Sequence, residues 1–203
     1  MSTQICEQTL HMLRIRGRIT LEQLAEGLDV DADAIAGALA ELTDNGFVRN
    51  SGKPRIPWSI AEAGRQLAER RMTGISAAAK ARCGEHYQRF QGLNGELKQL
   101  CADWQARDTG TAAADFVPRL APIDDAVQDT LRQITPVAPA FAMYGRRLSR
   151  AKDLFADGAG NYLTGIMVDS YHTAWFELHE CFFVTLGRSR QAEEIPRPSH
   201  PVP

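Results

Sequence analysis

The side chains best suited to chemistry gather near the end of the chain, where Asp169, His172, His179 and Glu180 occur among aromatic residues. At 100° per residue on a helix, His172, Phe176 and His179 share one stripe, and both carboxylates fall within or beside it. Such a helix is apolar around most of its circumference, which is typical of the centre of a bundle or of a subunit interface. Buried polar groups need partners, so we expect an interhelical hydrogen-bond network or a small-molecule pocket.

These residues do not match a known metal or catalytic motif. His172 and His179 are separated by about 10.5 Å along a helix, which is too far for both to coordinate one ion. The chain also lacks a glycine-rich phosphate loop and a nucleophile elbow. We therefore expect no metal, no cofactor and no enzymatic activity.

A long helix expected at about 77–107 supplies further candidates for the same pocket. Its apolar residues recur every three or four positions, with Tyr87 on this stripe and Asn94 beside it. Asn94 is interpreted either as a satisfied buried amide or as a ligand contact. The full set of predicted ligand-binding residues is Tyr87, Asn94, Asp169, His172, Phe176, His179 and Glu180.

Cations lie on both sides of an acidic segment near the N-terminus. Residues 20–48 contain seven Asp or Glu residues and no Lys or Arg. Because duplex affinity comes largely from cations placed against phosphates, the flanking cations are the candidates for DNA contact, and the alternative is that they are ordinary solvated charges. The predicted DNA-binding residues are Arg16, Arg18, Arg49, Lys53 and Arg55.

A second basic cluster is formed by Arg146, Arg147, Arg150 and Lys152. We expect these residues to form a solvated face of a helix through Phe141 to Phe155. The alternative is that they steer an anionic ligand or contact an acidic partner.

The elements around the acidic segment follow one another in a specific order. Thr20 is predicted to cap a helix that carries Leu21, Leu24 and Leu28, and a turn follows at 29–31. The next helix, at about 32–45, ends at Asn45-Gly46, where glycine supplies the left-handed conformation. Strands at 47–49 and 56–60 with a tip at 50–54 complete the pattern.

This order over roughly the first 75 residues resembles the winged helix-turn-helix domain of MarR-type bacterial regulators. The resemblance implies a DNA-binding domain in which helix 32–45 occupies the recognition position. Such domains usually present uncharged polar side chains or Arg there, whereas this chain offers Asp31, Asp33 and Glu41. These carboxylates repel phosphate, so the wing is the better candidate for contact with DNA.

Two tracts, 86–105 and 169–180, are similar to a helical module of actinobacterial proteins that often follows a regulator-like winged helix. The same module resembles the C-terminal extension of some actinobacterial pyruvate phosphate dikinases. The phosphate-transfer apparatus of those kinases has no counterpart in this sequence, so the resemblance implies no kinase activity.

We predict a mainly α fold, with an N-terminal winged helix-turn-helix domain at 1–75 and a C-terminal antiparallel helical bundle at 76–190. A loop at 108–121, a helix opening at Pro122 and a final helix at about 162–189 are expected within the bundle. A proline-rich flexible tail is expected at 191–203. The four cysteines are isolated, which favours reduced thiols, and no apolar run is long enough for a membrane span. We therefore expect a cytoplasmic protein.

Two functions are consistent with these features. In the first, the chain is a homodimeric transcription regulator that binds double-stranded DNA, and its helical domain dimerises and senses a small-molecule effector. In the second, it is an accessory subunit that does not bind DNA and uses both domains for protein contact. The acidic helix favours the second function, and the arginines around it favour the first.

Overall fold

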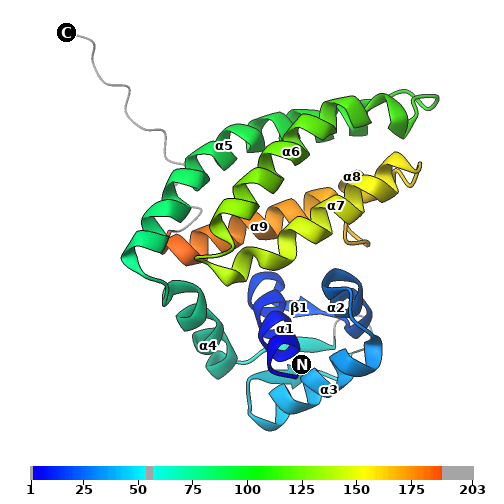
Figure 1. Cartoon of the computed structure of the whole chain (residues 1–203). Helices are drawn as coiled ribbons and strands as arrows, with labels where there is room; N and C mark the ends of the chain where they lie inside the picture. Colours follow the sequence, from blue (N-terminus) through cyan, green and yellow to red (C-terminus); the bar gives the residue numbers. More distant parts are fainter. Residues whose placement is uncertain (1, 54–56, 189–203) are drawn as a thin grey trace.

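The computed structural model describes residues 2–53 and 57–188, and this part of the chain is mainly helical with one small sheet (Figure 1). The predicted mainly α class is therefore confirmed. None of the helices formed by the described residues combines the length and apolar character that a membrane span requires. The predicted tail at 191–203 lies outside the described residues.

The N-terminal part combines helices with very short strands. Its elements are α1 (Ser2–Arg16), β1 (Arg18–Ile19), α2 (Leu21–Leu28), α3 (Ala32–Asp44), β2 (Val48–Asn50), β3 (Trp58–Ile60) and α4 (Glu62–Thr73).

The ends of α2 and α3 are set by local side-chain and backbone chemistry. The Oγ1 atom of Thr20 accepts a hydrogen bond from the backbone N–H of Gln23 at 3.2 Å, and the Gln23 side chain accepts one from the Thr20 N–H at 3.1 Å. This capping box satisfies two amides that a helix start otherwise leaves without partners. After α3, Gly46 has φ +72°, a conformation that favours glycine. The predicted cap at Thr20 and the predicted stop at Asn45-Gly46 are both confirmed.

The three strands form one antiparallel sheet in the order β1-β3-β2. Ser59 at the centre lies opposite both Arg18 and Arg49, and these three side chains therefore share one face. The other face carries Ile19 and Val48, which are buried. The sheet thus covers the core with one side and presents two arginines on the other.

The described residues of the C-terminal part, 74–188, form helices joined by turns and loops. Its elements are α5 (Ala77–Ala106), the short 3-10 helix η1 (Ala113–Asp115), α6 (Val117–Ile134), the 3-10 helix η2 (Pro139–Phe141), α7 (Ala142–Ala156), α8 (Asn161–Thr164) and α9 (Tyr171–Leu186). The long helix expected at 77–107 is confirmed by α5.

Two predicted boundaries in this part are wrong. The loop expected at 108–121 ends early, because α6 begins at Val117 with Pro118 in its first turn and keeps Pro122 inside the helix. The single helix expected at 162–189 is two helices separated by residues 165–170. The Oγ atom of Ser170 accepts a hydrogen bond from the backbone N–H of Thr173 at 3.2 Å and caps a new helix there. Asp169 consequently lies in the turn before α9.

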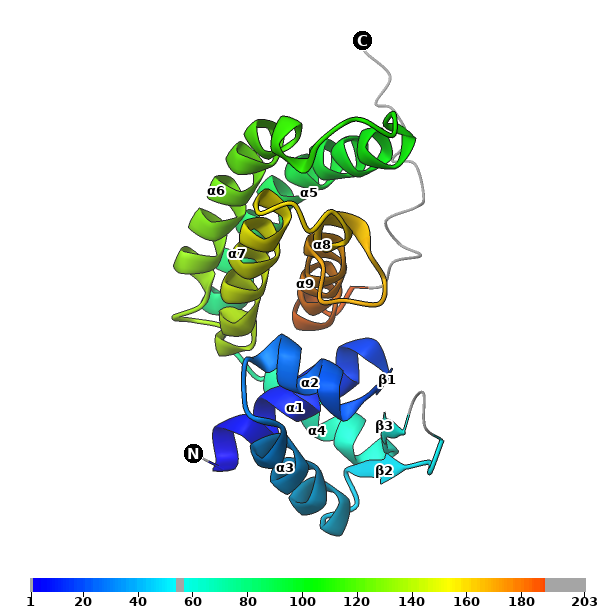
Figure 2. The same cartoon turned by 90° about the vertical axis from the view of Figure 1, so that its right-hand side faces the viewer.

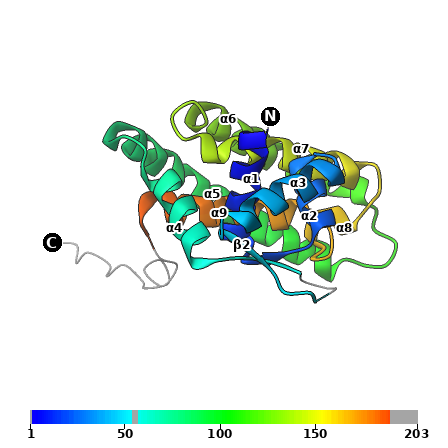
Figure 3. The same cartoon turned by 90° about the horizontal axis from the view of Figure 1, so that it is seen from below.

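The helices of the two parts pack against each other around α9. It contacts α5 and α7 on the C-terminal side and α1 and α4 on the N-terminal side. Figure 2 shows α7 and α9 side by side next to α1 and α2, and in Figure 3, seen from below, α1, α2 and α3 lie in front of the C-terminal helices. One apolar cluster runs through both parts, with Leu13 and Phe182 among its fully buried members.

The four cysteines contribute to this core. Cys6, Cys83, Cys101 and Cys181 are all buried free thiols, as their isolation in the sequence predicts. Burial raises the pKa of the Cys101 thiol to about 11. Burial likewise raises the pKa of the Cys83 and Cys181 thiols, so these three thiols stay protonated at neutral pH.

The capping box gives a first testable prediction. Thr20→Ala removes the acceptor for the Gln23 amide and is expected to lower the free energy of unfolding by about 1 kcal/mol. Urea unfolding followed by circular dichroism measures this loss. Thr43→Ala is the matched control, because Thr43 lies on the exposed side of α3 and its hydroxyl group donates to the Leu39 carbonyl of the same helix. An equal loss in both variants contradicts the capping role.

Candidate nucleic-acid interface and a buried ion-pair cluster

The outer face of the small sheet carries exposed cations. Arg18 and Arg49 flank Ser59 on adjacent strands, and Lys53 is exposed in the segment that follows β2. None of these three cations forms an ion pair within residues 2–53 and 57–188. Arg55, the remaining cation predicted to contact DNA, lies outside the described residues. The sheet face therefore has positive charge that is not neutralised by described carboxylates.

Arg16 behaves differently, because carboxylates of the protein itself hold its side chain, and this argues against its predicted contact with DNA. Its guanidinium donates to an Asp169 carboxylate oxygen at 2.9 Å and also pairs with Glu177. Only 14% of its side chain is exposed. The last turn of α1 lies against α9, so the Arg16 guanidinium forms its ion pairs within the protein.

Arg147 from α7 completes this cluster, hereafter the ion-pair cluster of Arg16, Arg147, Asp169 and Glu177. Arg147 donates from Nε and Nη2 to the two oxygens of Asp169 at 2.9 and 2.6 Å, and from Nη1 to Glu177 at 2.7 Å. Only 2% of the Arg147 side chain is exposed. Two guanidiniums thus face two carboxylates, so the formal charges balance within the cluster.

The protonation states in the cluster follow from this pairing. Burial opposes ionisation of Asp169, but the hydrogen bonds and positive charges of Arg147 and Arg16 outweigh it and lower the pKa of the carboxyl group. Burial also opposes the charge of Arg147, whereas Glu177 and Asp169 hold its pKa well above the usual value. Asp169 and Arg147 are therefore each kept ionised by the opposite charges of their partners in the cluster.

The basic cluster on α7 serves mainly to join helices, so the expectation of a solvated cationic face is wrong for its buried member Arg147. Arg146 donates to the Leu28 carbonyl, and Arg150 donates to the Glu26 carbonyl at 2.8 Å, which attaches α7 to α2. Lys152 donates at 2.5 Å to Asp124, a buried carboxylate on α6.

The seven residues predicted to bind a ligand do not converge on one place. Tyr87 and His179 share a hydrogen bond of 3.0 Å between Oη and Nε2, and Asn94 accepts one from Trp175 Nε1 at 3.0 Å. Both contacts join α5 to α9.

The other four lie apart from these contacts. Asp169 belongs to the ion-pair cluster, and Glu180 lines a separate surface groove of about 440 Å³ next to Arg14. His172 and Phe176 are exposed, with Phe176 at 50%, so the expectation that they belong to a buried stripe is wrong. The hydrogen-bond network expected between helices does exist, whereas the ligand role of these residues stays a prediction.

A second polar contact joins α1 to α7. The Nε2 atom of His11 lies 2.8 Å from Tyr144 Oη, and both side chains are buried. Burial, together with the positive charges of Arg147 and Arg14, lowers the pKa of His11 to about 4. His11 is therefore neutral at pH 7. Sequence reasoning missed both partners of this contact, since His11 is an isolated histidine in an otherwise ordinary amphipathic helix.

Comparisons of the chain with models of protein families, with curated proteins and with solved structures found no match. The resemblances inferred from the sequence therefore stay predictions, and the candidate sites rest on the geometry described above.

The ion-pair cluster predicts a large and partly reversible loss of stability. Arg147→Met leaves two buried carboxylates facing only Arg16 and is expected to lower the free energy of unfolding by about 3 to 5 kcal/mol. Adding Glu177→Gln restores charge balance between Arg16 and Asp169, so the double variant is expected to be more stable than the single one. Urea unfolding measures the free energy of unfolding of both variants.

Arg146→Ala serves as the control for this experiment, because the Arg146 side chain is half exposed and is expected to contribute about 1 kcal/mol or less. Equal stabilities of Arg147→Met and the double variant would show that charge balance does not matter there.

The low pKa of His11 predicts a specific dependence of stability on pH. The unfolded chain takes up a proton near pH 6.5, whereas the folded chain does so only near about pH 4. The stability supplied by neutral His11 is therefore complete above pH 6.5 and is lost as the pH falls toward 4. Between about pH 7.5 and pH 5 this loss is about 2 kcal/mol.

The measurement is urea unfolding at both pH values for the native chain and for His11→Gln, which cannot titrate. The variant is expected to have the smaller pH dependence, and identical slopes contradict the role of His11.

Proposed function

We propose that the chain is a cytoplasmic DNA-binding transcription regulator with a winged helix-turn-helix at its N-terminus, and that it contacts the duplex through its wing. The observation that carries the proposal is the row Arg18, Ser59 and Arg49 on the outer face of the sheet, with Lys53 nearby. Arg14 and Arg16, by contrast, are held by carboxylates of the protein itself. The cations of the sheet are thus available to an outside anion.

The spacing of the sheet fits contacts with a phosphate backbone. Arg18 and Arg49 lie on strands that flank β3, so their Cα atoms are about 10 Å apart at the usual distance between neighbouring strands. Two guanidiniums at this separation can each bind a different phosphate, and arginine forms bidentate contacts with phosphate oxygens. Contacts of this kind position a protein on DNA but do not read the sequence.

The α3 helix is poorly equipped for base recognition. Its exposed residues include Asp33, Glu41 and Asp44, whereas Ile35 and Leu39 are buried on its inner side. These carboxylates repel a duplex at short range. On this proposal the wing supplies the affinity, and a homodimer supplies the two half-site contacts common among such regulators.

The acidic surface of α3 also favours a second candidate function. An accessory subunit that binds a basic segment of another protein would use the same carboxylates, and it would need no cation on this helix. The two functions use different surfaces of the N-terminal part, which makes them separable by experiment.

The prediction concerns the double variant Arg18→Ala with Arg49→Ala. It is expected to bind a fluorescent duplex from the region upstream of its own gene about tenfold or more weakly than the native chain. The slope of log affinity against log salt is expected to fall by about 2, one for each lost phosphate contact. Fluorescence anisotropy between about 50 and 200 mM salt measures both quantities.

Arg82→Ala with Arg89→Ala is the matched control, since both arginines are exposed on α5 and their loss changes the net charge by the same amount. This control is expected to retain native affinity. Equal weakening in both double variants, or no binding by the native chain at about 50 mM salt, overturns the proposal and leaves the protein-binding function.

A further inference from the structure

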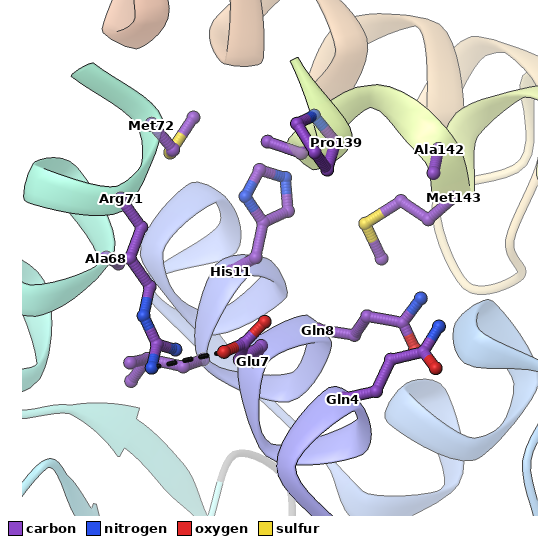
Figure 4. Close-up of a pocket in the computed structure, with 12 residues that line it drawn as sticks. Gln4, Glu7, Gln8, His11, Ala68, Arg71, Met72, Pro139, Ala142 and Met143 are labelled. Atoms are coloured by element: carbon purple, nitrogen blue, oxygen red, sulfur yellow. Dashed lines mark ion pairs between the residues drawn. The ribbon is translucent and has the colours of Figure 1, made fainter. Parts of the chain in front are cut away.

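A cavity of about 390 Å³ lies between the N-terminal part and the C-terminal helices. Its walls come from α1 and α4 on one side and from η2 and the start of α7 on the other (Figure 4). This volume is within the range of small-molecule sites in proteins. Because neither part forms the cavity alone, a molecule bound there would touch both.

The walls of the cavity are mostly apolar. Met72 and Met143 are almost completely buried and face it from α4 and α7, and Leu10, Ala68 and Pro139 add further apolar surface. Figure 4 shows Gln4 and Gln8 on the α1 side, across from Met143 and Ala142.

The charged residues of the cavity neutralise each other. The Arg71 guanidinium lies 3.3 Å from a Glu7 carboxylate oxygen, and both side chains are about half exposed. This pair therefore adds no net charge to attract an ionic ligand. Arg71 is already engaged, so it does not provide a free anchor for a carboxylate or a phosphate.

His11 adds a buried polar group to the cavity wall. Its Nε2 atom contacts Tyr144 Oη, whereas its Nδ1 atom forms no hydrogen bond with a described residue. The ring is neutral at pH 7, so Nδ1 donates or accepts according to the tautomer. A hydroxyl group suits either case, because it is both a donor and an acceptor.

We propose that this cavity binds a neutral, mainly apolar small molecule that carries one hydroxyl group, with the hydroxyl hydrogen-bonded to His11 Nδ1. A phenol or an alcohol with a ring or chain of moderate size has this chemistry. The apolar body packs against Met72 and Met143. An anion would find the lining cation Arg71 already paired with Glu7, so its desolvation would not be compensated.

A ligand in this cavity would also regulate DNA binding, an inference that rests on the proposed function. A ligand that contacts α1, α4 and α7 favours the arrangement of the two parts in which the cavity is best filled. The sheet with Arg18 and Arg49 is joined directly to α1 and α4. Occupancy therefore alters how the wing is presented to DNA.

The test uses the full chain labelled with 13C at its methionine methyl groups and 1-naphthol as the probe. The chain contains five methionines. The NMR signals of Met72 and Met143 are expected to shift in a saturable manner, while that of Met167, which is 80% exposed, stays in place. The anion 1-naphthoate, of similar size, is expected to bind at least tenfold more weakly.

Ala142→Phe fills the cavity from a residue that is itself exposed, and it is expected to reduce 1-naphthol affinity at least tenfold. Ala156→Phe is the matched control, because it places the same side chain at an exposed position at the other end of α7. His11→Phe keeps the volume of the ring but removes the hydrogen bond to the ligand hydroxyl group. It is therefore expected to weaken the binding of 1-naphthol.

Three results overturn the inference: no shift at Met72 and Met143, equal shifts at all methionines, or native affinity in Ala142→Phe. The NMR titration contains no DNA, so its outcome is independent of the anisotropy assay. Binding of 1-naphthol without any duplex binding would reject the regulator and retain the site. Duplex binding without a shift of the methionine signals would reject the ligand site and retain the regulator.

Discussion

The structure depends on the pairing of Arg147 with Asp169 and Glu177 at the place where α1, α7 and α9 meet. A guanidinium this deeply buried is tolerated only because two carboxylates satisfy its donors in a fixed, forked geometry. Arg16 brings the second positive charge and thereby attaches the end of α1 to α9. Since β1 begins two residues after Arg16, the same cluster determines where the sheet starts relative to the C-terminal helices.

Local chemistry was predictable from the sequence wherever its causes lie within a few residues. The capping box of Thr20 and Gln23 and the left-handed Gly46 are encoded by neighbours in the chain. The start of α6 was not predictable in this way. Proline favours the first turn of a helix, and both Pro118 and Pro122 fit that preference, so it cannot choose between them. The break before α9 was missed because Ser170 sits inside a continuing apolar pattern, which hid its role as a cap.

The candidate sites were harder to predict, because their partners lie far apart in the sequence. Arg16 and Arg18 are two residues apart, yet the largely covered side chain of Arg16 pairs with Asp169, whereas Arg18 is exposed on a strand. A count of charges along the chain cannot separate them, because the carboxylates that bind Arg16 are more than 150 residues away. Glu177 carried a usable signal, since a carboxylate between Ala174 and Cys181 on a buried helix face requires a cationic partner. The sequence did not say which arginine that would be.

The positions of the cavity and the ion-pair cluster along α1 constrain what a bound molecule can do. The cavity touches residues from Gln4 to His11, whereas the cluster holds Arg16 at the opposite end. Breaking the cluster is expected to cost several kcal/mol, which is comparable to the whole stability of many domains. If the proposed molecule fills the cavity, we therefore expect α1 to tilt about its anchored end rather than to slide. Because α1 packs against both α3 and α4, such a tilt reaches the two helices that frame the sheet without disturbing the charges that hold the molecule together.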